Sequence, residues 1–226
     1  MLFISKGQRT RGAVRCREMG GFTRVFRLKL NSRLDPGTVV EKLGVAVGSL
    51  FPNVEIAGEW DVRAKSLLSS KEDDDSMMFI VNMNTSKFEY LLKDFAMVTL
   101  KKNSMDDRLK GYRTRREGII QGKQYQCGDY NIRIGVRAMS QRIDSVIIEV
   151  EHRALSGPSI AMELISKVVA KLSERFHQQN EKMELGDVDL FFPPNILTKL
   201  FETYGLLTNG VFIEEHLALQ HLMLIK

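Results

Sequence analysis

Two carboxylates and a guanidinium alternate along residues 146–153, which read VIIEVEHR. Successive side chains of a β-strand point to opposite faces, so Glu149, Glu151 and Arg153 share one face if this segment is a strand. Paired carboxylates are ligands for a hard divalent cation, and a guanidinium binds phosphate oxygens. The pattern therefore predicts either a metal and phosphate site or the charged face of an amphipathic strand.

This spacing resembles the E-x-E-x-K signature of tunnel triphosphatases, whose barrel lumen holds a metal ion against a triphosphate. Such a site needs several acidic strands and several inward lysines or arginines, because one pair of carboxylates cannot neutralise the metal and leave donors for the phosphates. No second Glu-x-Glu lies in a predicted strand, and Asp187-x-Asp189 falls in a predicted linker. A metal-dependent tunnel triphosphatase using Glu149, Glu151 and Arg153 is therefore kept as the alternative function.

The preceding segment, residues 130–138, offers partners for these carboxylates. A hairpin that turns near Gln141 sets Arg133 opposite Glu149 and Asn131 opposite Glu151. Such cross-strand pairs contribute about 0.2–1 kcal/mol and fix the register. We therefore expect the charges to form ordinary outward-facing pairs, with hydrocarbon filling the interior of the sheet.

Other catalytic and metal-binding patterns fail in the sequence. Residues 118–124, GIIQGKQ, have the wrong spacing for a P-loop. His216 and His221 lie five residues apart on a predicted helix, which directs them away from each other, and Cys16 and Cys127 have no companions at ligand spacing. We expect no catalytic residue, no metal and no cofactor.

The composition favours one globular domain behind a basic leader. The chain has 226 residues, 43% of them hydrophobic, and no apolar run approaches the roughly 20 residues of a bilayer span. Residues 1–33 contain nine Lys and Arg but one acid. We expect residues 1–20 to be a flexible solvated leader, with nucleic-acid contact as the less favoured alternative, and residues 21–226 to form the domain. A second basic run, 108–116, is interpreted as a solvated connector.

The periodicity predicts an α+β fold. Strands are expected at 22–30, 54–63, 77–83, within 88–101, and at 119–126, 130–139 and 145–153, and helices at 36–51, 103–111, from 156 onward, and at 196–204 and 214–224. Too few helices alternate with strands for a parallel sheet. We therefore predict an antiparallel, many-stranded β-barrel flanked by α-helices, because closure removes exposed strand edges.

Several segments resemble, in order and spacing, the Mediator subunit 20 family. The segments are 122–135 (GKQYQCGDYNIRIG), 146–152 (VIIEVEH), 58–61 (GEWD), 78–81 (MFIV) and 204–206 (YGL) ahead of a helix carrying His216 and 218–220 (ALQ). The resemblance covers about residues 22–222. The basic leader, the acidic loop at 69–76 and the linker around 191–194 depart from the family pattern.

The resemblance implies a fold and a role. The fold is a many-stranded barrel flanked by helices, similar in shape to tunnel phosphatases but without their chemistry. The role is non-enzymatic and nuclear: pairing with Mediator subunit 18, which a helix of subunit 8 tethers, in the head module that helps RNA polymerase II to initiate transcription.

Phe191 and Phe192 are the candidate partner contacts. They lie in a predicted linker bounded by Pro193 and Pro194, and stable interfaces bury aromatic anchors in an apolar centre. The alternative is that they seal the mouth of the barrel.

Overall fold

The computed structural model describes residues 21–30, 34–70, 76–94, 96–102, 109–140, 142–155, 157–180, 188–190, 194–204, 206 and 212–224. The elements in chain order are β1 (Phe22–Lys29), α1 (Pro36–Leu50), β2 (Glu55–Ser69), β3 (Met77–Met83), β4 (Phe88–Lys93), β5 (Ala96–Lys101), β6 (Tyr112–Cys127), β7 (Tyr130–Met139), β8 (Arg142–His152), α2 (Pro158–Gln179), β9 (Val188–Leu190), α3 (Pro194–Thr203) and α4 (Glu214–Met223). No helix in these ranges is long and apolar enough to cross a membrane.

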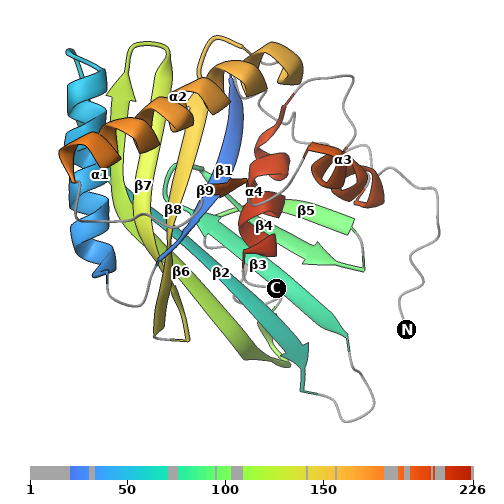
Figure 1. The fold of residues 1–226 in the computed structure, drawn as a ribbon. Helices are drawn as coiled ribbons and strands as arrows, with labels where there is room; N and C mark the ends of the chain where they lie inside the picture. The colour runs from blue at the N-terminus through green and yellow to red at the C-terminus, as the bar shows by residue number, and fades with distance from the viewer. Residues whose placement is uncertain are drawn as a thin grey trace.

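The strands form one curved antiparallel sheet of nine strands (Figure 1). Their order is β5-β4-β3-β2-β6-β7-β8-β1-β9, and neighbouring strands pair antiparallel throughout. The predicted antiparallel sheet with flanking helices is confirmed. Within the described ranges no strand pairing joins β5 to β9, so these two strands form the edges of the sheet.

Two helices cover the outer face of β7 and β8 (Figure 1). α1 starts where Asp35 accepts a hydrogen bond from the Thr38 N–H at 2.8 Å, with Pro36 at its first position. The side chains that α1 and α2 bury are Val39, Leu43, Ala46 and Val47, and Ala161, Ile165, Val169, Leu172 and Phe176. The ring of Tyr130 lies 6.1 Å from that of Phe51 at the end of α1. The even-numbered side of β7 therefore faces outward, under these helices.

The fourth helix, α4, fills the concave face. Every residue from 215 to 222 is buried, because α4 contacts β1, β2 and β3, which lie on opposite halves of the sheet. The Trp60 ring on β2 lies 6.1 Å from His221. The buried residues of α4 are Leu217, Ala218, Leu219 and Leu222, but also Glu215, His216, Gln220 and His221. The interior is thus half polar, and the expectation of a purely hydrocarbon filling was wrong.

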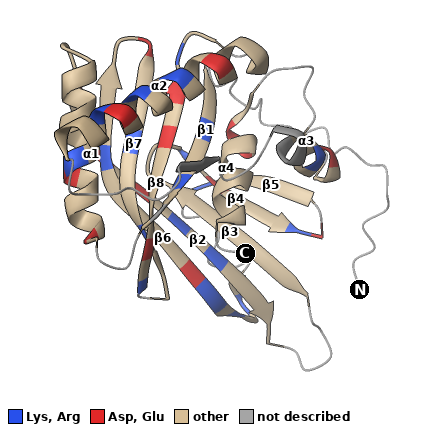
Figure 2. Ribbon diagram, in the orientation of Figure 1, with Lys and Arg blue, Asp and Glu red and all other residues tan. Residues whose placement is uncertain are grey.

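The basic run is a strand over most of its length. β6 begins at Tyr112 and pairs with β2 from Arg116 opposite Ser66 to Tyr112 opposite Ser69, so the interpretation of 112–116 as a connector was wrong. Residues 113–116 are all exposed, and no apolar alternation marks them as a strand. Charged residues on such an extension, beyond the end of β7, discourage pairing with other strands. Figure 2 shows basic and acidic residues interspersed along β2, β6 and α2 rather than gathered in one field.

Some predicted features lie outside the described residues. These are the leader 1–20, most of the predicted helix at 103–111, the acidic part of the 69–76 loop, and Phe191 and Phe192. The β2–β3 hairpin itself is confirmed, because Leu68 pairs with Met77. Asp189 belongs to β9, opposite Arg27 of β1, and not to a linker.

Replacing each of two glycines by alanine should change the stability of the protein in opposite directions. Gly122 on β6 faces Gly135 on β7, and a Cβ at Gly122 would collide with backbone atoms of Ile134 and Gly135. We expect Gly122→Ala to destabilise the protein by about 1–3 kcal/mol, because the strands must separate.

Gly48 on α1 is the matched control. A Cβ there would meet only the Val54 side chain, at 3.9 Å. Gly48→Ala should therefore stabilise the helix, by about 1 kcal/mol. Urea unfolding midpoints measure both changes, and equal midpoints for the two variants would contradict the strand contact.

Candidate functional site

Four charged or titratable side chains meet between the sheet and α4. Arg133 on β7 lies opposite Glu149 on β8, and Asn131 lies opposite Glu151, so the predicted hairpin register is confirmed. The Arg133 guanidinium donates from Nη1 to Glu149 Oε1 and from Nη2 to Glu151 Oε2, the latter at 2.8 Å. From α4, His221 Nε2 lies 2.7 Å from Glu149 Oε2.

The sheet also supplies neutral partners to this buried cluster, which we define as Arg133, Glu149, Glu151 and His221. Arg133 Nε donates to Gln124 Oε1 at 3.0 Å. Asn131 Nδ2 donates to Glu151 Oε2 at 3.0 Å. Both oxygens of Glu149, and all three nitrogens of the Arg133 guanidinium, are therefore engaged within the fold.

The buried cluster faces inward, so the expectation of outward-facing pairs was wrong. The side chain of Glu149 is 1% exposed and that of Arg133 is 6% exposed. Both faces of β7 and β8 are covered, one by α1 and α2 and the other by α4. Strand alternation correctly places the odd-numbered charged residues and the even-numbered apolar residues of β7 and β8 on opposite faces. It does not predict which of the two faces a helix from the end of the chain will cover.

Arg153 does not join the buried cluster. β8 ends at His152, and the Arg153 backbone N–H donates to the Asp129 carbonyl at 2.7 Å in the β6–β7 turn. Its exposed side chain reaches the Gly128 carbonyl. The predicted Glu149, Glu151 and Arg153 set is thus broken, and the cation beside the two carboxylates is Arg133.

The electrostatics favour the ionised pair. Burial would raise the pKa of the Glu149 carboxyl, but the Arg133 guanidinium and the His221 hydrogen bond hold that pKa below its ordinary value. Burial would likewise lower the pKa of Arg133, but the two carboxylates raise it above its ordinary value. Within the buried cluster Arg133 and Glu149 therefore form an ion pair, in which each charge stabilises the ionised form of the other.

Hydrogen bonds also hold both ends of α4 to the sheet. At its start, Glu214 Oε2 accepts from the Tyr90 and Ser86 hydroxyls, and Thr99 donates to Glu215 Oε1 at 2.8 Å. At its end, Arg137 donates to the Leu224 carbonyl at 2.6 Å. No local pattern predicts the contact between Glu214 and Tyr90, because 124 residues separate them.

A polar cavity remains next to the buried cluster. It has a volume of about 220 Å³. Its lining consists of Met83, Thr85, Ser86, Asn131, Arg133, Glu151, Glu214 and Leu217. The described residues contain no group of three His, Cys, Asp or Glu side chains arranged to hold a metal ion. His216 and His221 serve separate purposes, because His216 accepts from the Ile213 N–H and contacts the Leu206 carbonyl.

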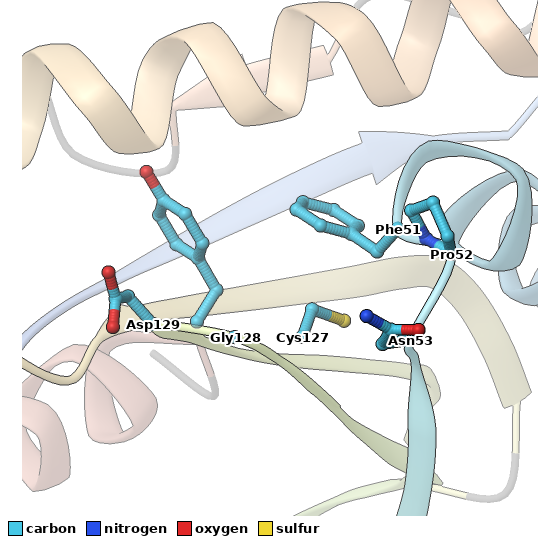
Figure 3. Close-up of a pocket in the computed structure, with 7 residues that line it drawn as sticks. Phe51, Pro52, Asn53, Cys127, Gly128 and Asp129 are labelled. Carbon is cyan, nitrogen blue, oxygen red and sulfur yellow. The ribbon is translucent and has the colours of Figure 1, made fainter.

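A second cavity, of about 320 Å³, lies where the end of α1 meets the β6–β7 turn (Figure 3). Phe51 and Pro52 form one side, and Cys127 lies across from them on β6. Burial raises the pKa of the Cys127 thiol to about 11. The thiol is therefore protonated at neutral pH and is a poor nucleophile.

The fold and its interior define a class of protein. A curved antiparallel sheet holds its own C-terminal helix on the concave face, and Arg133 pairs with the two carboxylates between them. The family model described as "TATA-binding related factor (TRF) of subunit 20 of Mediator complex" matches residues 46–225. The match spans most of the chain, so the chain belongs to the Mediator subunit 20 family, as the sequence resemblance predicted.

Solved structures of similar shape are distant in sequence. A chain of the Schizosaccharomyces pombe Mediator head module is 13% identical, with a TM-score of 0.39, and the match covers 73% of this chain and 98% of that one. A putative adenylate cyclase from Vibrio parahaemolyticus is 10% identical, with a TM-score of 0.43, and the match covers 78% of this chain and 98% of that one. The S. pombe Pct1 RNA triphosphatase is 7% identical, with a TM-score of 0.32, and the match covers 69% of this chain and 78% of that one. At these TM-scores the similarities carry no argument about function. A comparison with curated proteins gave no match.

Removing the charge of Glu149 should lower the urea concentration at which the protein unfolds. Glu149→Gln keeps the shape of the side chain but leaves the buried Arg133 with Glu151 as its one carboxylate partner. We expect a loss of about 3–5 kcal/mol, as for a broken buried ion pair, measured by urea unfolding at pH 7.

The matched control is Glu163→Gln on α2. Glu163 is exposed and pairs with Lys167 one helical turn away, so the change should leave the unfolding midpoint nearly unmoved. Equal midpoints for the two variants would show that the buried cluster does not stabilise the fold.

Acidification should remove the contribution of the ionised Glu149 carboxylate to the free energy of unfolding. Because the pKa of Glu149 in the folded state lies below its ordinary value of 4.5, its stabilisation is complete above that pH and declines as the pH falls toward the folded-state pKa. The difference in unfolding free energy between the wild type and Glu149→Gln should therefore shrink below pH 4.5.

The comparison of the two proteins also cancels a separate acid effect. Burial lowers the pKa of His216 from 6.5. The contribution of this residue to stability therefore falls as the pH drops below about 6.5, and it falls equally in both proteins. A difference that stays constant down to about pH 3 would contradict the depressed pKa of Glu149.

Proposed function

We propose that this protein is a non-enzymatic subunit of the Mediator head module, located in the nucleus, that pairs directly with Mediator subunit 18. In this proposal subunit 8 tethers the pair, and the assembled complex supports initiation by RNA polymerase II. The observation that carries the proposal is the family match over residues 46–225.

The interior of the sheet supports a role in assembly over the alternative of a tunnel triphosphatase. A metal ion bound with a polyphosphate needs carboxylate oxygens that are free to coordinate it. Both oxygens of Glu149 are occupied, one by Arg133 and the other by His221. Arg153 lies outside the buried cluster, and α4 occupies the space where a substrate would bind.

Partner contact is proposed for Phe191 and Phe192, which lie outside the described residues. The support comes from the sequence: two adjacent aromatic residues bounded by prolines are suited to anchor an interface. The basic leader, residues 1–20, is not assigned a role in pairing.

Co-purification tests the pairing. The full chain, expressed with subunit 18 of the same organism, should elute with it as one complex in size-exclusion chromatography. Phe191→Asp should weaken the complex by at least about tenfold, since it places a charge in an apolar contact, whereas Phe191→Leu should not. Wild-type yield of the complex with Phe191→Asp would exclude Phe191 as a contact.

A triphosphatase assay tests the absence of catalysis. The purified chain should release no phosphate from triphosphate-ended RNA in Mn²⁺. Release that disappears in Glu149→Ala, in a variant shown to remain folded, would instead support the tunnel triphosphatase.

A further inference from the structure

The polar cavity beside the buried cluster has walls from three distant parts of the chain. Thr85 and Ser86 come from the β3–β4 connection, Asn131 and Glu151 from the β7–β8 hairpin, and Glu214 from the first turn of α4. The cavity therefore exists only when α4 lies in place, and it is part of the folded state.

The two carboxylates in the cavity wall, Glu151 and Glu214, are not fully balanced by neighbouring positive charges. Glu149 and Glu151 share the single guanidinium of Arg133. Glu214 accepts hydrogen bonds from the Tyr90 and Ser86 hydroxyls, and within the described part of the chain no Lys or Arg forms an ion pair with it. Burial and the neighbouring Glu214 raise the pKa of Tyr90, so this donor is neutral.

A further cation, Lys102, reaches the cavity wall. The ammonium group of Lys102 donates to the carbonyl of Met83 at 3.0 Å. Glu151 and Glu214 are the carboxylates of the lining, and its one guanidinium, Arg133, is also shared with the buried Glu149, which His221 contacts on its other side. A carboxylate in a partly enclosed site gains more from a cation than one in water, because the local dielectric is lower. The cavity is thus suited to a positively charged ligand.

An anionic ligand does not fit this charge. A polyphosphate, which the resemblance to tunnel triphosphatases would suggest, would be repelled by Glu151 and Glu214. A metal ion fits poorly for a different reason. One oxygen of each carboxylate already accepts two hydrogen bonds, Glu151 from Arg133 and Asn131, and Glu214 from Tyr90 and Ser86. Too few oxygens remain to replace the water shell of a divalent cation.

We infer that this cavity receives the guanidinium of an arginine side chain from the protein that pairs with this chain. A guanidinium is weakly hydrated and presents five donors in a plane, so it can meet acceptors on opposite walls at once. The acceptors are the second oxygens of Glu151 and Glu214 and the hydroxyl of Thr85. Arginine fits better than lysine, whose compact ammonium is strongly hydrated and presents its three donors from one point.

The source of this arginine rests on the proposed function, while the cavity and its charge do not. The arginine probe is Nα-acetyl-arginine methylamide, and its uncharged counterpart is the citrulline compound of nearly the same shape. Each is titrated into the full chain while methyl NMR signals of Met83, Thr85 and Leu217 are followed. The arginine compound should shift these signals in a saturable way, and the citrulline compound should not.

Glu214→Gln tests the carboxylate. Glutamine keeps an oxygen that can accept from Tyr90 and Ser86, so the variant should fold, which circular dichroism melting verifies. It should weaken binding of the arginine probe about tenfold, as for the loss of one charge-assisted hydrogen bond. Glu163→Gln, exposed on α2, is the control and should leave binding unchanged.

Three results would overturn the inference: no shifts with the arginine probe, equal shifts with citrulline, or unchanged binding in Glu214→Gln. The titration uses the chain alone, so it can fail while pairing with subunit 18 holds. The partner is tested separately: Glu214→Gln should weaken that pairing about tenfold. Wild-type pairing would refute the partner as the source of the arginine.

Discussion

The buried carboxylate of Glu149 links the sheet to the helix inside it. Arg133 contacts one of its oxygens and His221 the other. A carboxylate in a site this dry is stable only when its charge and both oxygens are satisfied, because an uncompensated buried charge costs several kcal/mol. Once strand alternation places Glu149 on the concave face, β7 must present Arg133 beside it and α4 must present His221 above it. Arg137 then fixes the end of α4 by its bond to the Leu224 carbonyl.

The same contacts remove the chemistry that the VIIEVEHR pattern suggests. Arg133 pairs with the carboxylates that could have held a metal, and α4 occupies the concave face. A cavity remains where the first turn of α4 meets the β3–β4 connection. What the fold presents to other molecules therefore includes its surface and this acidic recess, which agrees with membership of a family of complex subunits.

Local patterns in the sequence were sufficient for most of the elements and for the Arg133–Glu149 pair, but not for the start of β6 or for β9. α1 is marked by Asp35 and Pro36, and β7 and β8 by apolar alternation. The direction in which the charges point was not predictable, because both faces of β7 and β8 are covered and the covering helix comes from the far end of the chain. The start of β6 was missed because exposed arginines, beyond the reach of any helix, lack the alternation that marks a strand. The contact of Tyr90 with Glu214 depends on tertiary packing across 124 residues.

An ion pair in the interior has a consequence for strand register that hydrocarbon would not have. Residues 146–148 and 132–134 are rich in branched apolar side chains, and a slip of β8 along β7 by two residues would keep every side chain on its face. In the native register Glu149 lies opposite Arg133. A two-residue slip would place Glu149 opposite Asn131 in one direction and Gly135 in the other, and neither residue carries a positive charge. In either slipped register Glu149 would lie diagonal to Arg133, as Glu151 does in the native register, but it would lose its alignment with His221. The slipped registers are therefore penalised by a buried carboxylate oxygen left without its hydrogen-bond partner, a cost that apolar packing alone would not impose. The charges thus select one register among several that would bury similar hydrophobic area, and that register positions α4 and the cavity at its first turn.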